Sequence, residues 1–218
     1  MIRERRVILS LCDVTTHMVQ PWADAGFVCF CVDLRHPKGT AKRGNIYLIG
    51  ADILDWLPPR EDYAAAFAFT PCTNLSVSGA RWFMEKGIEG LLDGLTLFRR
   101  GVEIVEWTGA LWMAENPVST VSSYFRKPDF TFDPCEYAGY LPESERSSEA
   151  YTKKTCLWTG AGFTMPRKRP VPPALKSPIH YMPPSEDRGH RRSATPRGFA
   201  KAVFEANNNI PRSSSLTS

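Results

Sequence analysis

Short apolar runs alternate with longer amphipathic segments along the chain. Six runs of small, β-branched or aromatic residues are predicted to be strands, at residues 7–12, 27–34, 46–49, 63–68, 111–114 and 155–159. Apolar residues recur at helical spacing in three segments, at residues 18–26, 88–107 and 198–207. Strands that alternate with helices are typical of α/β proteins. We therefore expect an α/β fold, with a mainly parallel sheet flanked by helices.

The remaining segments lack a clear period. Residues 35–45 are expected to form a basic loop, residues 119–151 an aromatic and proline-rich excursion, and residues 166–184 a segment too rich in proline for helix or inner strand. This organisation predicts an α/β core at 1–160, a basic proline-rich segment at 161–194, a closing helix at 195–210 and a frayed tail at 211–218. In that closing helix, Thr195 is the expected cap and Pro196 the first helical residue.

Composition is that of an ordinary globular domain. The 218 residues are 43% hydrophobic and 11% aromatic, enough for one domain with a full core. The charged N-terminus has no apolar signal stretch behind it, and no run approaches the roughly 20 apolar residues that span a bilayer, so we expect a cytoplasmic protein. The six cysteines form neither a CxxC pair nor a zinc-type cluster with histidine. We expect reduced thiols and no metal.

A thiol and a carboxyl follow two neighbouring predicted strands. The run at 63–68 leads into Phe-Thr-Pro-Cys, ending at Cys72, and the run at 111–114 is followed by Glu115-Asn116-Pro117. Because parallel strands end at the same edge of a sheet, where ligands bind in open α/β folds, Cys72 and Glu115 are expected to face each other.

Acidic residues lie at the ends of other strands. Asp33 ends the second strand, where a carboxylate suits the hydroxyls of a ribose, and Asp52 follows the third, where it could accept from an exocyclic amine. Residues 13–17 form a short polar turn between the first strand and a helix, as in nucleotide-binding units, but without the glycine-rich fingerprint. The plain alternative for Asp33 is an ordinary surface aspartate at the end of a strand.

Positive charge is concentrated late in the chain, although the net charge is only +4. Residues 167–201 carry nine lysines and arginines against Glu186 and Asp187. Such an excess suits the phosphates of a nucleic acid, or it is a solvated basic loop. Residues 76–86, with Ser78, Arg81 and neighbouring aromatics, are candidates for a loop over a nucleic-acid substrate.

Taken in order, these features resemble a known family. Pro71-Cys72 after one strand and Glu115-Asn116-Pro117 after the next are similar to the nucleophile loop and the Glu-Asn motif of the cytosine-5 DNA methyltransferases. Over most of the chain, and especially in the stretch from Pro71 to Phe83, it resembles the small methyltransferase-like proteins often carried by bacteriophages. The resemblance implies a Rossmann-like fold that binds S-adenosylmethionine, with Cys72 and Glu115 as catalytic residues.

The resemblance also implies binding residues. Contacts to S-adenosylmethionine are expected from Cys12, Asp13, Thr15, Thr16, Asp33, Leu34, Asp52, Ile53, Phe69 and Pro71. Contacts to DNA are expected from Ser78, Arg81, Asn116, Lys153, Arg191 and Arg192. Little chain separates the strand at 155–159 from Thr195, where the family inserts a target-recognition domain. Single-stranded or flexible DNA is therefore the expected substrate.

Other classes of function fit the same residues. One is the same thiolate chemistry on RNA, on a free pyrimidine nucleotide or with an altered adenosyl donor. Another is a relative that binds the cofactor or nucleic acid without transferring a methyl group. A cysteine–histidine hydrolase is the outside option, since the four histidines lie in polar stretches without a paired motif.

Overall fold

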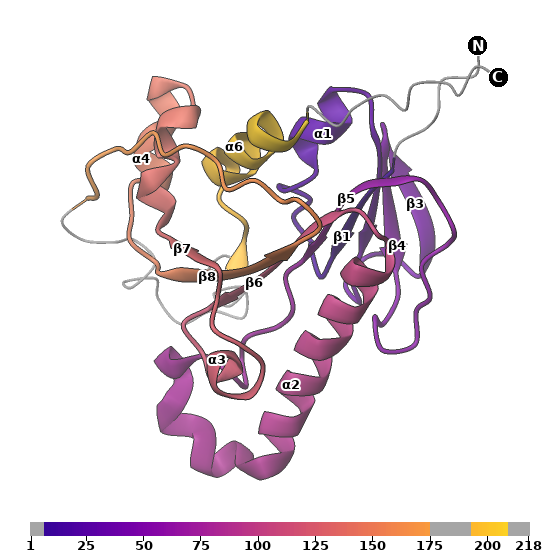
Figure 1. The fold of residues 1–218 in the computed structure, drawn as a ribbon, viewed down its shortest axis with the longest axis vertical. Coiled ribbons are helices and arrows are strands. Elements are labelled where there is room, and N and C mark those ends of the chain that lie inside the picture. Colours follow the sequence, from indigo (N-terminus) through magenta and orange to yellow (C-terminus); the bar gives the residue numbers. More distant parts are fainter. Residues whose placement is uncertain (1–6, 175–192, 209–218) are drawn as a thin grey trace.

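The computed structural model describes residues 7–174 and 193–208. In this part of the chain, eight strands form one sheet: β1 (Val7–Leu11), β2 (Val28–Val32), β3 (Gly39–Arg43), β4 (Ile46–Gly50), β5 (Tyr63–Ala68), β6 (Leu111–Pro117), β7 (Phe130–Phe132) and β8 (Thr155–Gly160). Their spatial order is β3-β4-β2-β1-β5-β6-β8-β7 (Figure 1). The α/β class expected from the sequence is confirmed.

The sheet is mixed rather than mainly parallel. Strands β4, β2, β1, β5 and β6 run parallel in the middle. The pairs β3–β4, β6–β8 and β7–β8 are antiparallel. At the β3 edge of the sheet, the antiparallel pair arises from a hairpin between β3 and β4. Gly44 lies in its turn with φ +57°, a left-handed conformation that glycine adopts without strain.

The strand β3 lies inside residues 35–45, which were expected to be a loop. Its five residues, Gly39 to Arg43, are nearly all exposed and pair on one side with β4. An edge strand with little buried surface has no apolar alternation for a periodicity argument to detect. The prediction of a loop was therefore wrong in this region.

Helices cover both faces of the sheet. They are α1 (Gln20–Asp24), α2 (Phe83–Trp107), α3 (Val121–Tyr124), α4 (Glu143–Glu149) and α6 (Arg197–Asn207), with 3-10 turns η1 (Val77–Trp82), η2 (Pro134–Glu136) and η3 (Ala138–Tyr140). The side chains of α2 pack on one face, whereas α1 and α6, which lie side by side, cover the other (Figure 1). The three-layer arrangement follows from the sheet being apolar on both faces.

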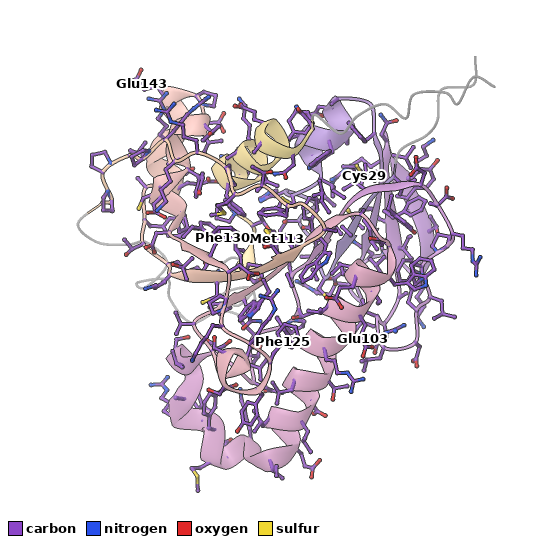
Figure 2. The ribbon with its side chains drawn as sticks, in the orientation of Figure 1. Cys29, Glu103, Met113, Phe125, Phe130 and Glu143 are labelled. Atoms are coloured by element: carbon purple, nitrogen blue, oxygen red, sulfur yellow. The ribbon has the colours of Figure 1, made fainter. Side chains whose placement is uncertain are left out.

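Aromatic residues fill both halves of the core. On the α1 and α6 side, Trp22 is fully buried and makes edge contacts with Phe27 and Phe204, with ring centroids 5.3 and 5.1 Å apart. On the α2 side, Phe98 packs edge-on against Trp158 at 5.0 Å and Phe125 at 5.7 Å. Figure 2 shows Phe125 between α3 and α2. These contacts hold the strand ends in fixed positions.

The long helix α2 connects β5 to β6, as expected from the apolar period of residues 88–107. It starts earlier, at Phe83, and is broken at Gly87, where φ is +62° and ψ is −165°. Gly94 and Gly101 face the sheet edge closely: a Cβ on Gly94 would come within 2.7 Å of Leu75. The small residues thus let the helix lie directly against the chain that carries Cys72.

The closing helix α6 begins at Arg197 with Pro196 as its N-cap, one residue later than expected. Thr195 does not cap it. The carboxylate of Glu149, from the end of α4, accepts hydrogen bonds from the backbone N–H of Arg197 at 2.5 Å and of Gly198 at 2.8 Å. A residue distant in sequence therefore satisfies the first donors of the helix.

Candidate functional site

One large cavity lies along the carboxyl ends of the parallel strands. The strand order reverses between β1 and β5, which is where open α/β sheets form a ligand crevice. The cavity has a volume of about 1290 Å³. Typical small-molecule pockets measure about 300–1,000 Å³, so this one has room for more than a single small ligand.

Cys72 lines this cavity from the loop after β5. The carbonyl oxygen of Cys72 accepts hydrogen bonds from the N–H groups of Leu75 at 3.0 Å and Ser76 at 2.9 Å, which closes a tight turn. Leu75 is fully buried beneath the turn. The thiol is therefore presented, partly exposed, on a rigid support.

The Cys72 loop is joined to the loop after β6. The N–H of Val77 donates to the carbonyl of Val118 at 3.1 Å, and the N–H of Thr120 donates to the carbonyl of Leu75 at 3.0 Å. These bonds fix the relative positions of the two strand ends. Cys72 and Glu115 thus line one cavity from adjacent parallel strands.

Glu115 lies within β6, opposite Leu157 of β8, and is half-buried. Burial raises the pKa of the Glu115 carboxyl above its ordinary value, and the positive charge of Lys153 opposes this only in part. The carboxyl therefore keeps its proton to a higher pH than an exposed glutamate. A carboxyl of raised pKa is better suited to donate a hydrogen bond or a proton than an exposed glutamate.

The other end of the cavity is acidic. Cys12, Asp33 and Asp52 line it from the ends of β1, β2 and β4. Burial, followed by the negative charges of Asp33, Asp52 and Asp13, raises the pKa of the Cys12 thiol to about 12. One oxygen of Asp33 accepts from the N–H of Arg35 at 2.8 Å. Local turns therefore orient these carboxylates.

The turn between β1 and α1 is organised by Asp13. This buried carboxylate accepts hydrogen bonds from the hydroxyl of Ser10 at 3.0 Å, the hydroxyl of Thr15 at 3.1 Å and the backbone N–H of Thr16 at 2.8 Å. Cys12 and Thr16 have φ of +57° and +60°. The turn therefore takes left-handed conformations that favour glycine although it contains none.

Most of the site residues predicted from the sequence meet in this cavity. Its lining includes Cys12, Asp13, Thr15, Asp33, Leu34, Asp52, Ile53, Phe69, Pro71, Cys72, Ser78, Arg81, Glu115 and Lys153. The predicted nucleic-acid contacts Arg191 and Arg192 lie outside the described residues.

Two predicted contacts are placed elsewhere. Thr16 does not line this cavity; its buried side chain points to a second cavity and accepts a hydrogen bond from Arg43. Asn116 is fully buried, and its amide donates to the carbonyl of Thr70 at 3.4 Å. Alternation along β6 explains this, because successive side chains point to opposite faces and Glu115 takes the face of the cavity. Asn116 therefore supports the loop that leads to Cys72.

Several cavity residues were not predicted as contacts. Trp82, Lys86, Lys154 and Thr195 all line it. Trp82 and Lys86 are close in sequence to Arg81, so the basic and aromatic character of residues 76–86 was the available signal. From the sequence, Thr195 was predicted only to cap the closing helix.

Cations gather at the Cys72 and Glu115 end. Arg81 lies over the ring of Trp82, with 5.0 Å between the guanidinium carbon and the ring centroid, and both side chains are exposed. The Lys86 ammonium donates to the carbonyl of Thr73 at 2.6 Å, and Lys153 and Lys154 line the same end. The cavity is thus acidic near β1, β2 and β4 and basic near β5, β6 and β8.

The late basic tract is partly neutralised. Lys168 pairs with Glu136 at 2.6 Å, Arg169 with Glu205 at 3.4 Å, and Arg197 with Glu145 at 2.7 Å. These three cations form ion pairs that hold the chain to the core. They therefore contribute less to a surface that could bind a polyanion than the sequence suggested.

Within residues 7–174 and 193–208, no three histidine, cysteine or acidic side chains are grouped to hold a metal ion. In the same ranges, no helix is long and apolar enough to cross a bilayer. All six cysteines are thiols rather than disulfide partners. A scan against models of protein families and a search of curated proteins found no match to this chain.

Proposed function

We propose that the protein is an S-adenosylmethionine-dependent methyltransferase that acts on carbon 5 of cytosine in DNA through a covalent Cys72 adduct. The parallel strands occur in the order third, second, first, fourth, fifth, which is the order of a Rossmann-like sheet and supports such a fold. The antiparallel strands β8 and β7 complete one side of the sheet.

The observation that carries the proposal is the composition of the main cavity. A thiol and a carboxyl of raised pKa line its basic end, and the carboxylates of Asp33 and Asp52 line its acidic end. Transfer of a methyl group between two ligands requires that the acidic and the basic end belong to one continuous cavity. The volume of about 1290 Å³ provides it.

The chain's own residues account for activation of the ring. The Cys72 thiolate would add to carbon 6 of cytosine, which moves an electron pair to carbon 5 and negative charge toward ring nitrogen 3. The Glu115 carboxyl, whose pKa is raised by burial, would neutralise that charge by giving a proton to nitrogen 3. After carbon 5 takes the methyl group, the proton on carbon 5 passes to water and the carbon–sulfur bond breaks, which releases the Cys72 thiolate. Nitrogen 3 then returns its proton to the Glu115 carboxylate, and the aromatic ring is restored.

The acidic end suits the proposed donor. S-adenosylmethionine carries ribose hydroxyls, an adenine amine and a positively charged sulfonium, all of which are favoured by nearby carboxylates. Asp33 and Asp52 would hold the nucleoside part, and the turn organised by Asp13 would form the wall beside it. When bound, the donor supplies an electrophilic methyl group.

The basic end favours a polymer over a free nucleotide. Arg81 and Trp82 are both exposed and stacked on each other at the cavity. Aromatic and guanidinium surfaces beside cations are what single-stranded nucleic acid binds, because bases stack on the planes while phosphates contact the charges. The target base must also be outside a duplex stack for Cys72 to reach carbon 6.

The test is trapping with 5-fluorocytosine. Fluorine at carbon 5 cannot leave as a proton, so a DNA oligonucleotide containing it should remain bonded to Cys72 in the presence of S-adenosylmethionine. We expect a mass increase on the peptide containing Cys72, with single-stranded DNA trapped faster than duplex. RNA and 5-fluoro-deoxycytidine monophosphate, tested in parallel, identify the substrate class.

Matched variants make the result specific. Cys72→Ser should abolish the adduct, because a serine hydroxyl is far less ionised than a thiol, and Glu115→Gln should slow it. Cys135→Ser makes the same chemical change at a thiol outside the cavity and should leave trapping unchanged. No adduct with any of the four substrates, despite binding of S-adenosylhomocysteine, would favour a binding protein without transferase activity.

A further inference from the structure

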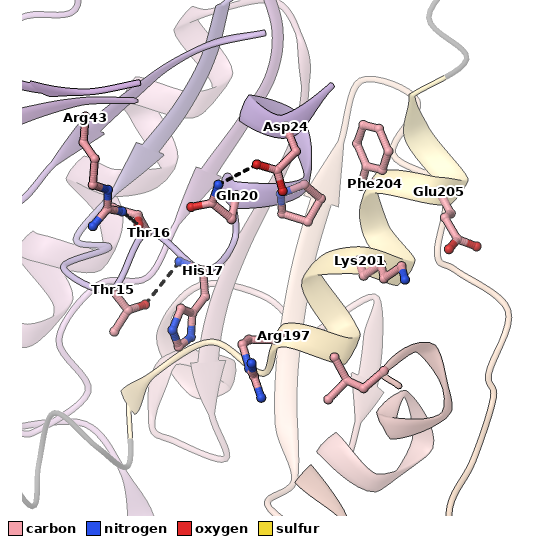
Figure 3. A pocket seen from close by; sticks show the side chains of 12 residues that line it. Thr15, Thr16, His17, Gln20, Asp24, Arg43, Arg197, Lys201, Phe204 and Glu205 are labelled. Carbon is pink, nitrogen blue, oxygen red and sulfur yellow. Dashed lines mark hydrogen bonds between the residues drawn. The ribbon is translucent and has the colours of Figure 1, made fainter. Parts of the chain in front are cut away.

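A second cavity lies behind the turn between β1 and α1. Its volume is about 530 Å³, within the range of small-molecule pockets. The turn, α1, β3, the chain before α4 and α6 all contribute to its wall (Figure 3). Thr15 lines both this cavity and the main one, so the two are separated only by the turn that Asp13 organises. The proposed methyl transfer makes no use of this space.

The wall combines apolar and cationic groups. Pro21, Leu141 and the half-buried ring of Phe204 provide apolar surface. Arg43 and Lys201 bring positive charge from β3 and α6, which lie on either side of the space in Figure 3. In the described part of the chain, neither has a carboxylate within ion-pair distance.

The other charged groups of the wall are already engaged. Arg197 pairs with Glu145 at 2.7 Å, and Glu205 pairs with Arg169 at 3.4 Å. Asp24 accepts a hydrogen bond from the Gln20 amide at 2.7 Å. This amide is neutral and leaves the charge of Asp24 in place, but Arg43 and Lys201 outnumber that one carboxylate, so the net charge left to attract a ligand is positive.

Hydrogen bonds hold the polar part of the wall in place. The hydroxyl of Thr16 accepts from Arg43, so this guanidinium is positioned while its remaining donors stay available. One ring nitrogen of His17, Nδ1, lies 3.0 Å from the carbonyl oxygen of Thr195. A site with orienting polar groups and an apolar wall has the usual construction of a ligand pocket.

We propose that this cavity is a second ligand site, for a small organic anion that has a ring or short apolar body and a phosphate or carboxylate group. The apolar body would contact Phe204 and Pro21, and the anionic group would lie beside Lys201, while Arg43 adds positive charge from the opposite wall. A charge-assisted hydrogen bond from Lys201 makes this the end that determines affinity.

Phenyl phosphate is the simplest probe of this class, measured by isothermal titration calorimetry on the full chain without donor or nucleic acid. It should bind more tightly than phenol, which lacks the anion, and than inorganic phosphate, which lacks the ring. Lys201→Ala should weaken its binding roughly five- to tenfold, the loss expected for one charge-assisted contact. Alanine is a good helix former and Lys201 is exposed, so α6 should remain intact.

The control is Lys42→Ala, which removes the same charge from β3 beside Arg43 but outside the cavity. It should change the affinity less than twofold. Equal losses in Lys42→Ala and Lys201→Ala would mean a diffuse charge effect and overturn the proposal. A larger loss in Arg81→Ala than in Lys201→Ala would place the probe in the main cavity and overturn it as well. These outcomes do not depend on methyl transfer.

Discussion

Replacing Glu149 by alanine should destabilise the whole domain, because this one carboxylate caps α6. Glu149 is only 7% exposed and accepts from two backbone N–H groups, of Arg197 and Gly198. Each buried donor left without a partner costs about 1–3 kcal/mol, and loss of a cap about 0.5–2 kcal/mol. Since water can partly replace the carboxylate, we expect a loss of about 2–4 kcal/mol. For a chain of this size the melting temperature should fall by roughly 5–15 °C.

Two further variants test this reasoning at neutral pH, by urea denaturation followed by circular dichroism. Glu149→Gln keeps one carbonyl acceptor, and because burial raises the pKa of Glu149 it also removes a penalised charge, so it should lose less than half as much as alanine. Glu145→Ala breaks an ion pair of 2.7 Å with the same Arg197, but both side chains are over 40% exposed, so the loss should stay below about 1 kcal/mol. If the alanine variants at 145 and 149 lost equal stability, the capping role would be refuted.

Three other variants or reactions follow from the site. Glu115→Gln should stabilise the fold at pH 7, because burial raises the folded-state pKa of Glu115 and so penalises its carboxylate. The gain should shrink as the pH falls through the unfolded-state pKa of about 4.3 and vanish below about pH 3, where the wild-type side chain is protonated in both states. Urea titrations at pH 7 and pH 3 check this. Iodoacetamide at pH 8 should modify Cys12 on the order of 10³ times more slowly than a cysteine in the unfolded chain, because the pKa of the Cys12 thiol is about 12. Peptide mapping measures the two rates, and equal rates would contradict the burial of Cys12. Leu75→Ala should lower the free energy of unfolding by about 2–5 kcal/mol and reduce the yield of the Cys72 adduct, because Leu75 is fully buried. A loss of stability under about 1 kcal/mol would show that the Cys72 turn does not depend on Leu75.

The strand ends were predictable because their signal is local. A buried strand needs a continuous apolar run, and the polar residue that follows it lies at the sheet edge. On this basis four residues were predicted to lie at one edge of the sheet: Asp33, Asp52, Cys72 and Glu115. In the structure, all four line one cavity. Which roles they have remains a proposal.

The features that the sequence did not reveal share a different cause. The edge strand β3 is almost entirely exposed, so its pairing depends on β4 rather than on its own pattern. Asn116 was grouped with Glu115 by sequence, yet alternation along β6 sends it into the core. Glu149 had no local mark of a capping residue, because the helix it caps lies far along the chain. Contacts of this kind are set by tertiary packing, which one sequence read locally does not show.

The pairing of α1 with α6 has a consequence for how the chain is made. His17 Nδ1 and the carbonyl oxygen of Thr195 lie 3.0 Å apart, although 178 residues separate them in sequence. During synthesis, β1, β2, β5, β6 and α2 can assemble one face of the sheet once residue 117 has emerged. The opposite face, with Trp22 and Phe67, waits for Phe199 and Val203 of α6. A ribosome-bound chain therefore carries an uncovered apolar surface over this interval, and it is the stage at which a chaperone would protect the protein from aggregation.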